Sequence, residues 1–241
     1  MKTSQPTTAT FSIQRAADRA FADHGWLKAR HSFSFADYVD PDNLNWGALR
    51  VFNDDRIAGG AGFPPHPHRD MEIVTYVFSG ALAHKDNMGN EGVVQPGGVQ
   101  FMSAGTGVVH SEFNALPDTE LHLVQMWVMP GQRGVKPSYG QLDFTVGDRL
   151  NKWLTPVSGR AKVDAHIRIT QDASLHIARL EGPTLERAFD PNRYAFLFVG
   201  HGEIVANGET LAAGDAARLF NVEKLNLSGE GEIVLLDLPA A

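Results

Sequence analysis

The sequence contains no cysteine, no block of basic residues and no apolar run of the roughly 18 residues that a membrane span needs. The missing cysteine excludes disulfides, thiolate catalysis, iron–sulfur clusters and zinc fingers. The formal net charge of −7 argues against binding of bare nucleic acid, which depends on clustered Lys and Arg. The polar N-terminus, residues 1–14, lacks the apolar core of a signal peptide. We therefore expect a cytoplasmic protein that contacts neither membrane nor nucleic acid.

The chain is rich in turn-forming residues: 24 glycines and 13 prolines recur between short apolar runs in its 241 residues. This pattern is typical of a multi-stranded β fold. The clearest predicted strands are rich in β-branched, aliphatic and aromatic residues. They are Glu72–Phe78, Leu121–Val128, Ser174–Leu180, Tyr194–Val199 and Glu232–Leu238. The segment Ala16–Ala22 is a short helical candidate without a decisive apolar stripe, so the chain is predicted to be mainly β.

A connector rich in glycine and proline, Met129–Pro137, divides the chain into two parts. Each part contains strands that end in glycine turns, such as Tyr76–Gly80 in the first and Leu197–Gly200 in the second. This faint repeat favours a duplicated barrel. We predict an N-terminal domain over residues 1–135 and a C-terminal domain over residues 136–241.

The sequence contains two pairs of potential metal ligands, and within each pair the residues are two positions apart. The pairs are His66 with His68 and His110 with Glu112. Because side chains alternate between the faces of a strand, the members of each pair point the same way. Two neighbouring strands of a barrel could bring three imidazoles and one carboxylate to one point. Such a set of nitrogen and oxygen donors suits Fe, Mn, Co, Ni, Cu or Zn, and the donors alone do not select among them.

Other residues near this pattern have simpler interpretations. Pro67 donates no backbone hydrogen bond, which predicts an edge or bulged strand. His122 lies in a strongly apolar strand and is expected to be a hydrogen-bonded core residue, while His24 and His31 are expected to pack or hydrogen-bond in an aromatic-rich segment. In the second half, Phe220–Val222 occupies the position of the second donor pair. That half is therefore predicted to bind no metal.

Two groups of residues resemble the two motifs of cupin proteins. The first comprises His66, His68, Glu72 and Gly80, and the second Gly98, Gly105, His110 and Asn114, with Ser103 where cupins have a proline. Four segments resemble the pirin family more narrowly: Pro65–Arg69, Gln95–Gly98, Met102–Gly105 and His110–Glu112. The resemblance implies an all-β bicupin, two tandem antiparallel β-barrels (double-stranded β-helices) of which the first binds metal. It also implies a monomer.

The resemblance bears on the choice of ligands as well. The resemblance to ordinary cupins implies the metal ligands His66, His68, Glu72 and His110. The resemblance to pirins implies a different set, in which the carboxylate comes from the second strand: His66, His68, His110 and Glu112. Strand parity permits both, because positions 66 to 72 share one face of an uninterrupted strand. The pirin resemblance favours Glu112 and leaves Glu72 to support the ligands from outside the coordination sphere.

Members of the pirin family are associated with quercetin 2,3-dioxygenase activity. The resemblance implies an oxidoreductase that cleaves flavonols such as quercetin with dioxygen, using one divalent transition metal, Fe(II) before the others. Glu112 would be both ligand and general base, and ring opening would release carbon monoxide. The family's eukaryotic members imply an alternative, a metal-dependent regulator that acts through a protein partner. A third hypothesis is a metal-free barrel that binds a small molecule.

Overall fold

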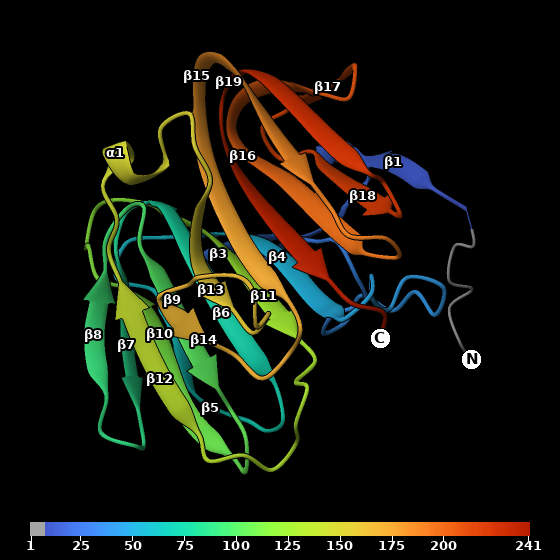
Figure 1. Cartoon of the computed structure of the whole chain (residues 1–241). Coiled ribbons are helices and arrows are strands. Elements are labelled where there is room, and N and C mark those ends of the chain that lie inside the picture. Colours follow the sequence, from blue (N-terminus) through green and yellow to red (C-terminus); the bar gives the residue numbers. More distant parts are fainter. Residues whose placement is uncertain (1–7) are drawn as a thin grey trace.

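The computed structural model describes residues 8–241, so the first seven residues of the polar N-terminal segment lie outside it. Almost all regular structure is β, arranged as two domains that lie side by side (Figure 1). Within the described residues, no helix is long and apolar enough to cross a membrane.

Two sheets form the N-terminal barrel, and all their strand pairs are antiparallel. The larger has the order β12 (Ser138–Leu142), β9 (Val99–Ser103), β6 (Glu72–Ser79), β11 (Leu121–Val128), β4 (Leu49–Ile57), β3 (Leu27–His31) and β2 (Ala20–Asp23). The smaller has the order β5 (Gly62–His68), β10 (Val108–Asn114), β7 (Leu82–Asp86) and β8 (Glu91–Val94).

One eight-stranded sheet forms the C-terminal barrel. Its order is β1 (Thr10–Gln14), β18 (Ala216–Phe220), β16 (Tyr194–Ala206), β19 (Lys224–Leu238), β15 (Ser174–Ala188), β13 (Leu154–Ser158) and β14 (Ile167–Arg168), with β17 (Glu209–Ala212) paired to β16. The pair β13–β14 is parallel and the other pairs are antiparallel. Long curved strands close this sheet around its own apolar core (Figure 1). The predicted all-β bicupin is confirmed.

The five strands predicted from the sequence all lie within observed strands, but the helical candidate at Ala16–Ala22 is wrong. Only the 3-10 turn η1 (Ala16–Asp18) forms there, and β2 begins at Ala20. Pairing of β2 with β3 supplies backbone hydrogen bonds that a helix of this length, below the roughly 12 residues needed for stability, could not match. The one α-helix of the described chain is short, α1 (Val146–Arg149), with a capping box between Thr145 and Asp148.

Strands from each end of the N-terminal part link the two domains. β1 precedes the first barrel in sequence but pairs with β18 of the second, and β12 follows residue 135 but pairs with β9 of the first. The domain boundary at residues 135 and 136 stays a prediction.

A large apolar cluster lies between the domains and contains side chains from both large sheets. Phe52 of β4 packs against Phe196 and Phe198 of β16, with ring centroids 4.7 Å and 5.0 Å apart. Side chains on the opposite face of β4 point into the N-terminal barrel. The sheet therefore serves two purposes, with one face joining the domains and the other lining the site.

Candidate metal centre

The two predicted donor pairs come together on neighbouring strands. In the antiparallel pairing of β5 and β10, His110 lies opposite His66, and their Nε2 atoms are 3.1 Å apart. His66, His68 and His110 each place a ring nitrogen within 4.8 Å of the others. β5 is the edge strand of its sheet and the pairing is irregular between His110 and Glu112, which confirms the prediction made from Pro67. Three imidazoles thus converge as the spacing predicts.

Burial keeps two histidines of the site, His68 and His110, neutral. Burial lowers the pKa of His68 to about 4, and the neighbouring rings of His110 and His66 add to the effect. Burial also lowers the pKa of His110 to about 3, with further contributions from His66 and His84. A metal ligand must be deprotonated, so these rings need not release a proton at neutral pH before binding a cation.

Contacts with neighbouring groups fix the orientation of His66 and His68. The Nδ1 atom of His66 lies 2.8 Å from the carbonyl oxygen of Pro64, to which it can donate only as N–H. That tautomer leaves Nε2 of His66 free as a lone-pair donor. The ring of His68 packs edge-on against Trp127, with centroids 4.9 Å apart. The rings of His66 and His68 are therefore held in place by the protein itself.

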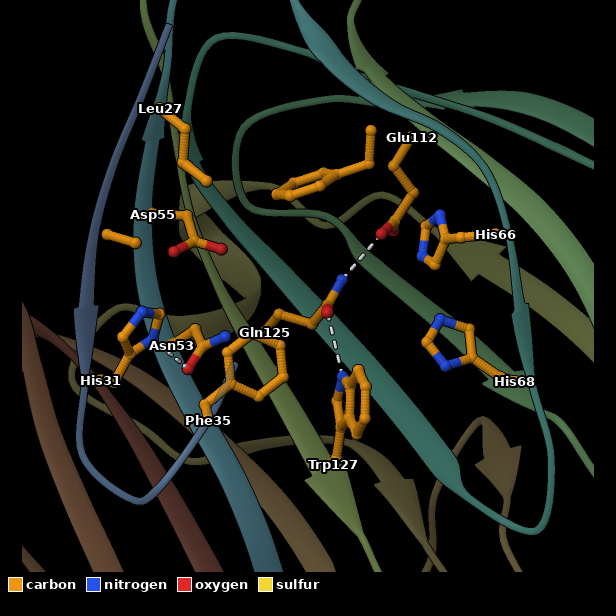
Figure 2. Close-up of a pocket in the computed structure, with 12 residues that line it drawn as sticks. Leu27, His31, Phe35, Asn53, Asp55, His66, His68, Glu112, Gln125 and Trp127 are labelled. Carbon is orange, nitrogen blue, oxygen red and sulfur yellow. Dashed lines mark hydrogen bonds between the residues drawn. The ribbon is translucent and has the colours of Figure 1, made fainter. Parts of the chain in front are cut away.

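Glu112 is held by two amides whose orientation is fixed by further contacts. Gln100 donates from Nε2 to Oε1 of Glu112 at 2.6 Å, and Gln125 donates from Nε2 to Oε2 at 2.8 Å. The indole N–H of Trp127 donates to Oε1 of Gln125 at 2.9 Å, which forces the amide nitrogen toward Glu112 (Figure 2). Each carboxylate oxygen keeps a second lone pair, so Glu112 can still bind a cation.

Glu72 lies elsewhere. The chain turns at Asp70, whose φ is +48°, and β6 begins at Glu72 in the other sheet. The assumption that one uninterrupted strand carries His66 through Glu72 is therefore wrong. Glu72 is fully buried and accepts hydrogen bonds from the backbone N–H and the hydroxyl of Thr170, which follows β14. The hydrogen bonds of Glu72 thus connect it to the second domain and not to a histidine.

A further histidine, which the sequence reasoning missed, lies behind His110. His84 of β7 is buried, and its Nδ1 is 3.4 Å from Nδ1 of His110. Its Nε2 is 3.3 Å from Oδ2 of Asp86, and its ring stacks on Tyr139 at a centroid distance of 4.1 Å. His84 and Asp86 share the i, i+2 spacing of the other pairs, so the signal was present. His84 also forms a second potential metal-binding group with His110 and Glu112.

The contacts give one consistent placement of protons. If His110 uses Nε2 as a ligand, its Nδ1–H donates to Nδ1 of His84, whose Nε2–H then donates to Asp86. Although burial acts to raise it, hydrogen bonds from Asn90, His84 and the Met88 backbone hold the pKa of Asp86 below its usual value. Asp86 is thus an anionic acceptor at the end of the chain of contacts.

We expect Asp86→Asn to weaken metal binding by about 10- to 100-fold, the usual cost of losing a partner of a metal-bound histidine. Oδ1 of Asp86 accepts from the backbone N–H groups of Met88 and Asn90, so an asparagine would keep its oxygen there and turn its amide N–H groups toward His84. If this amide donates to Nε2 of His84, the proton of His84 moves to Nδ1. There it would face the Nδ1–H of His110, and the two donors would repel each other.

Competition with a chelator measures the affinity. Glu91→Gln, at an exposed carboxylate on the adjacent strand β8, is the control and should bind normally. Equal affinities for the two variants would contradict the proton arrangement.

A cavity of about 160 Å³ opens beside these donors. Its wall contains His66, His68 and Glu112 and, across from them, residues of β3 and β4 (Figure 2). Several aromatic side chains complete it: Phe35, Phe63 and Trp127. The cavity is thus mainly apolar and has its polar groups at defined points, as is usual for small-molecule sites.

Two other histidines singled out from the sequence, His122 and His31, make their contacts outside the donor set. His122 lies on the face of β11 that is turned away from the cavity, where its Nε2 is 2.8 Å from Oδ1 of Asp54 and its ring stacks on Phe78. His31 contacts Asn53 at 2.9 Å and lines the cavity. Both are hydrogen-bonded, as expected.

The chain matches the model of the pirin family over residues 14–128 and that of the quercetinase C-terminal cupin domain over residues 155–238. It is 46% identical over 219 residues to a pirin-like protein of Caulobacter vibrioides, covering 90% of this chain and 94% of that protein. It is 37% identical to the quercetin 2,3-dioxygenase of Escherichia coli K12, covering 94% and 98% of the two chains.

The fold is similar to that of the bacterial pirin YhhW from Escherichia coli. The crystal structure of YhhW superposes with a TM-score of 0.89 at 36% identity, covering 96% of this chain and 99% of that one. YhhW in complex with nickel(II) gives a TM-score of 0.88 at 35% identity, with coverage of 96% and 100%.

Proposed function

Because this chain belongs to the pirin family, we propose that it is a metal-dependent dioxygenase that cleaves flavonols such as quercetin. The observation that carries the proposal is the convergence of His66, His68 and His110 beside Glu112 at the wall of an aromatic-lined cavity. A relative of nearly the same length is named quercetin 2,3-dioxygenase, which supports the substrate class.

We propose that His66, His68, His110 and Glu112 hold one divalent metal. Three imidazoles and one carboxylate fit the chemistry of first-row metals, and the nickel bound by YhhW shows that a related pirin takes such an ion. Fe(II) is our first candidate, since the reaction uses dioxygen, and Mn, Co, Ni, Cu and Zn are chemically compatible with the donors. The position of Glu72 against Thr170 supports Glu112 as the fourth ligand.

The side chains contribute binding and proton transfer. A bound metal would supply the Lewis acidity and redox capacity that no side chain offers. Glu112 accepts the proton of the flavonol 3-hydroxyl, and Gln100 and Gln125 keep its oxygens directed while it does so. Phe63 and Trp127 offer aromatic faces to a flat substrate and exclude water from it. The protein thus orients one substrate face and removes one proton.

An aerobic assay tests this function. Iron-loaded protein should bleach the flavonol absorbance band of quercetin and release one carbon monoxide per ring opened, and the rate should fall to background after removal of metal. Absence of turnover with iron, nickel, cobalt, manganese and copper would refute the proposal. A partner that binds only one iron oxidation state, without turnover, would then favour the regulator.

The fourth ligand can be tested separately by metal content. We expect Glu112→Ala to lose more than about 90% of its bound metal after dialysis, because it lacks the only charged donor of the set, and even a partner that merely supports a ligand is worth about 10- to 100-fold in affinity. Glu72→Ala should keep its metal, since this carboxylate contacts Thr170 of the second domain. Elemental analysis of proteins purified without a chelating tag gives the result. Loss of metal only from the Glu72 variant would show that the ordinary cupin ligand set applies.

We further propose that the protein acts as a cytoplasmic monomer with dioxygen and a flavonol as its partners. The division into residues 1–135, which hold the metal, and residues 136–241, which do not, is part of the same proposal. Size-exclusion chromatography with light scattering tests the oligomeric state.

A further inference from the structure

Asp55 is a buried carboxyl group without a partner. It lies on the face of β4 that points into the N-terminal barrel, and only 4% of its surface is exposed. Among residues 8–241, no side chain or backbone group hydrogen-bonds to it, and its Oδ1 is fully buried. Figure 2 shows the carboxyl group pointing into the cavity from the side opposite to His66 and Glu112. Buried polar groups are nearly always satisfied, so an unpartnered carboxyl group that faces a cavity is a candidate contact for a ligand.

The neighbours of Asp55 offer it no hydrogen bond. Leu27 and Ala29 of β3 line the same side of the cavity and are apolar. Of the other polar groups of the wall, Asn53 uses its Oδ1 for His31, and Gln125 is bonded to Glu112 and Trp127. A buried water molecule needs two to four polar partners, and this side of the cavity supplies few.

The chemical state of Asp55 narrows what it can bind. Burial raises its pKa to about 8, and the negative charges of Asp54 and Glu112 add to the effect while Arg19 opposes it. A protonated carboxyl group offers one O–H donor and one carbonyl acceptor. It therefore matches a hydroxyl group, which both donates and accepts.

We propose that Asp55 is a substrate-recognition residue that hydrogen-bonds a phenolic hydroxyl of the flavonol, remote from the oxygens that face the histidines and Glu112. The inference rests on the proposed function, which places the reacting end of the substrate at the donor set. With one end held there, the flat rings extend between Phe63 and Trp127, and a hydroxyl on the far side meets Asp55. The site thus selects flavonols with hydroxyl groups on their outer rings over flavonols that have only the 3-hydroxyl.

Binding of two flavonols under anaerobic conditions tests this role. Quercetin carries hydroxyls on both outer rings, whereas 3-hydroxyflavone has only the 3-hydroxyl and 4-keto group that face the metal site. Dissociation constants are measured by absorbance titration of the metal-loaded wild type, Asp55→Leu, Asp55→Asn and Asp54→Asn. Asp54 is the matched control, because it lies next in the chain and points away from the cavity, toward Arg19 and His122.

We expect Asp55→Leu to reduce the preference for quercetin over 3-hydroxyflavone by about tenfold, the usual effect of one lost hydrogen bond. Affinity for 3-hydroxyflavone should stay within about twofold, since the lost contact involves none of its groups. Asp55→Asn should keep most of the preference, because its carbonyl oxygen still accepts from a phenol. Asp54→Asn should behave as wild type. A general structural defect would instead weaken both ligands equally.

An unchanged preference in Asp55→Leu would overturn this role while leaving the dioxygenase proposal intact. If the metal-loaded wild type binds neither flavonol, the proposed function fails, and catechol titrated into the metal-free proteins decides the role of Asp55. Weaker catechol binding by Asp55→Leu than by wild type would support a phenol site at Asp55, and equal binding would exclude it.

Discussion

Replacement of His110 by alanine is expected to remove the bound metal and to lower the rate of quercetin cleavage more than 100-fold. His110 lies at the centre of the donor set: its Nε2 is 3.1 Å from Nε2 of His66, and its Nδ1 contacts His84. Loss of a partner that only orients a ligand already costs about 10- to 100-fold in affinity or activity, so loss of the ligand itself costs more. Elemental analysis and the aerobic quercetin assay measure the two effects.

His122→Ala is the matched control for this experiment. His122 is also a buried histidine in a central strand, but it faces Asp54 and Phe78 on the opposite side of the sheet. The control variant should lose some stability and keep its metal. If His110→Ala kept a full equivalent of metal and wild-type turnover, both the ligand set and the proposed function would be wrong.

Asp55→Leu is expected to stabilise the metal-free protein by a few kcal/mol at pH 8, on the order of 3. The carboxyl group of Asp55 is buried without a partner, and leucine would replace it with a side chain that suits Leu27 and Ala29. Removing an unsatisfied buried polar group is often stabilising. A gain of this size corresponds to an increase in Tm of roughly 6 to 12 °C for a chain of this length.

The gain should depend on pH. The pKa of Asp55 is about 8 in the folded protein and near 3.8 in the unfolded chain. Between these values the folded state binds the additional proton, so the stability of the wild type falls as pH rises from 4 to 8. Leucine does not titrate, and the advantage of the variant should therefore be small at pH 4 and largest at pH 8. Thermal denaturation across this range measures it.

Asp55→Asn serves as the control for the stability measurements, because it keeps a polar group but cannot ionise. It should share the pH trend of Asp55→Leu and gain less stability. A variant Asp55→Leu that is less stable than wild type at pH 8 would show that Asp55 makes a stabilising contact. Together with weaker discrimination between flavonols, a stability gain would identify a position where stability is given up for binding.

The resemblance of two short motifs to pirins and the periodic glycines together predicted much of this protein. The five clearest strands and the edge position of the strand with Pro67 follow from local rules, whereas the convergence of the three histidines was expected from the resemblance to cupins. Alternation of side chains needs only the sequence spacing, and His66 and His68 obey it whatever the partner strand is. The helical candidate at Ala16–Ala22 failed because β3 offers that segment a pairing partner.

The supporting residues of the site were not predictable in the same way. Gln100 and Gln125 are isolated amides among apolar neighbours, a weak signal that many core positions share, and the spacing of His84 and Asp86 does not say which strand lies beside them. Their importance depends on which strands lie beside β10, and this is set by sheet topology. The same holds for Glu72, which local spacing placed among the ligands and the turn at Asp70 placed against the second domain.

The sequence by itself determined the donor chemistry. Without cysteine, any metal here must be held by nitrogen and oxygen, and the i, i+2 pairs put those donors on one face of each strand. Only the tertiary structure decided which face of β4 and β11 meets the cavity, and so which acid is a free carboxyl group inside the barrel. Asp54 and Asp55 are consecutive residues of the same type, yet Asp54 contacts Arg19 and His122 between the domains while Asp55 faces the cavity. Their difference arises because burial and partners depend on the packing of strands far apart in the chain.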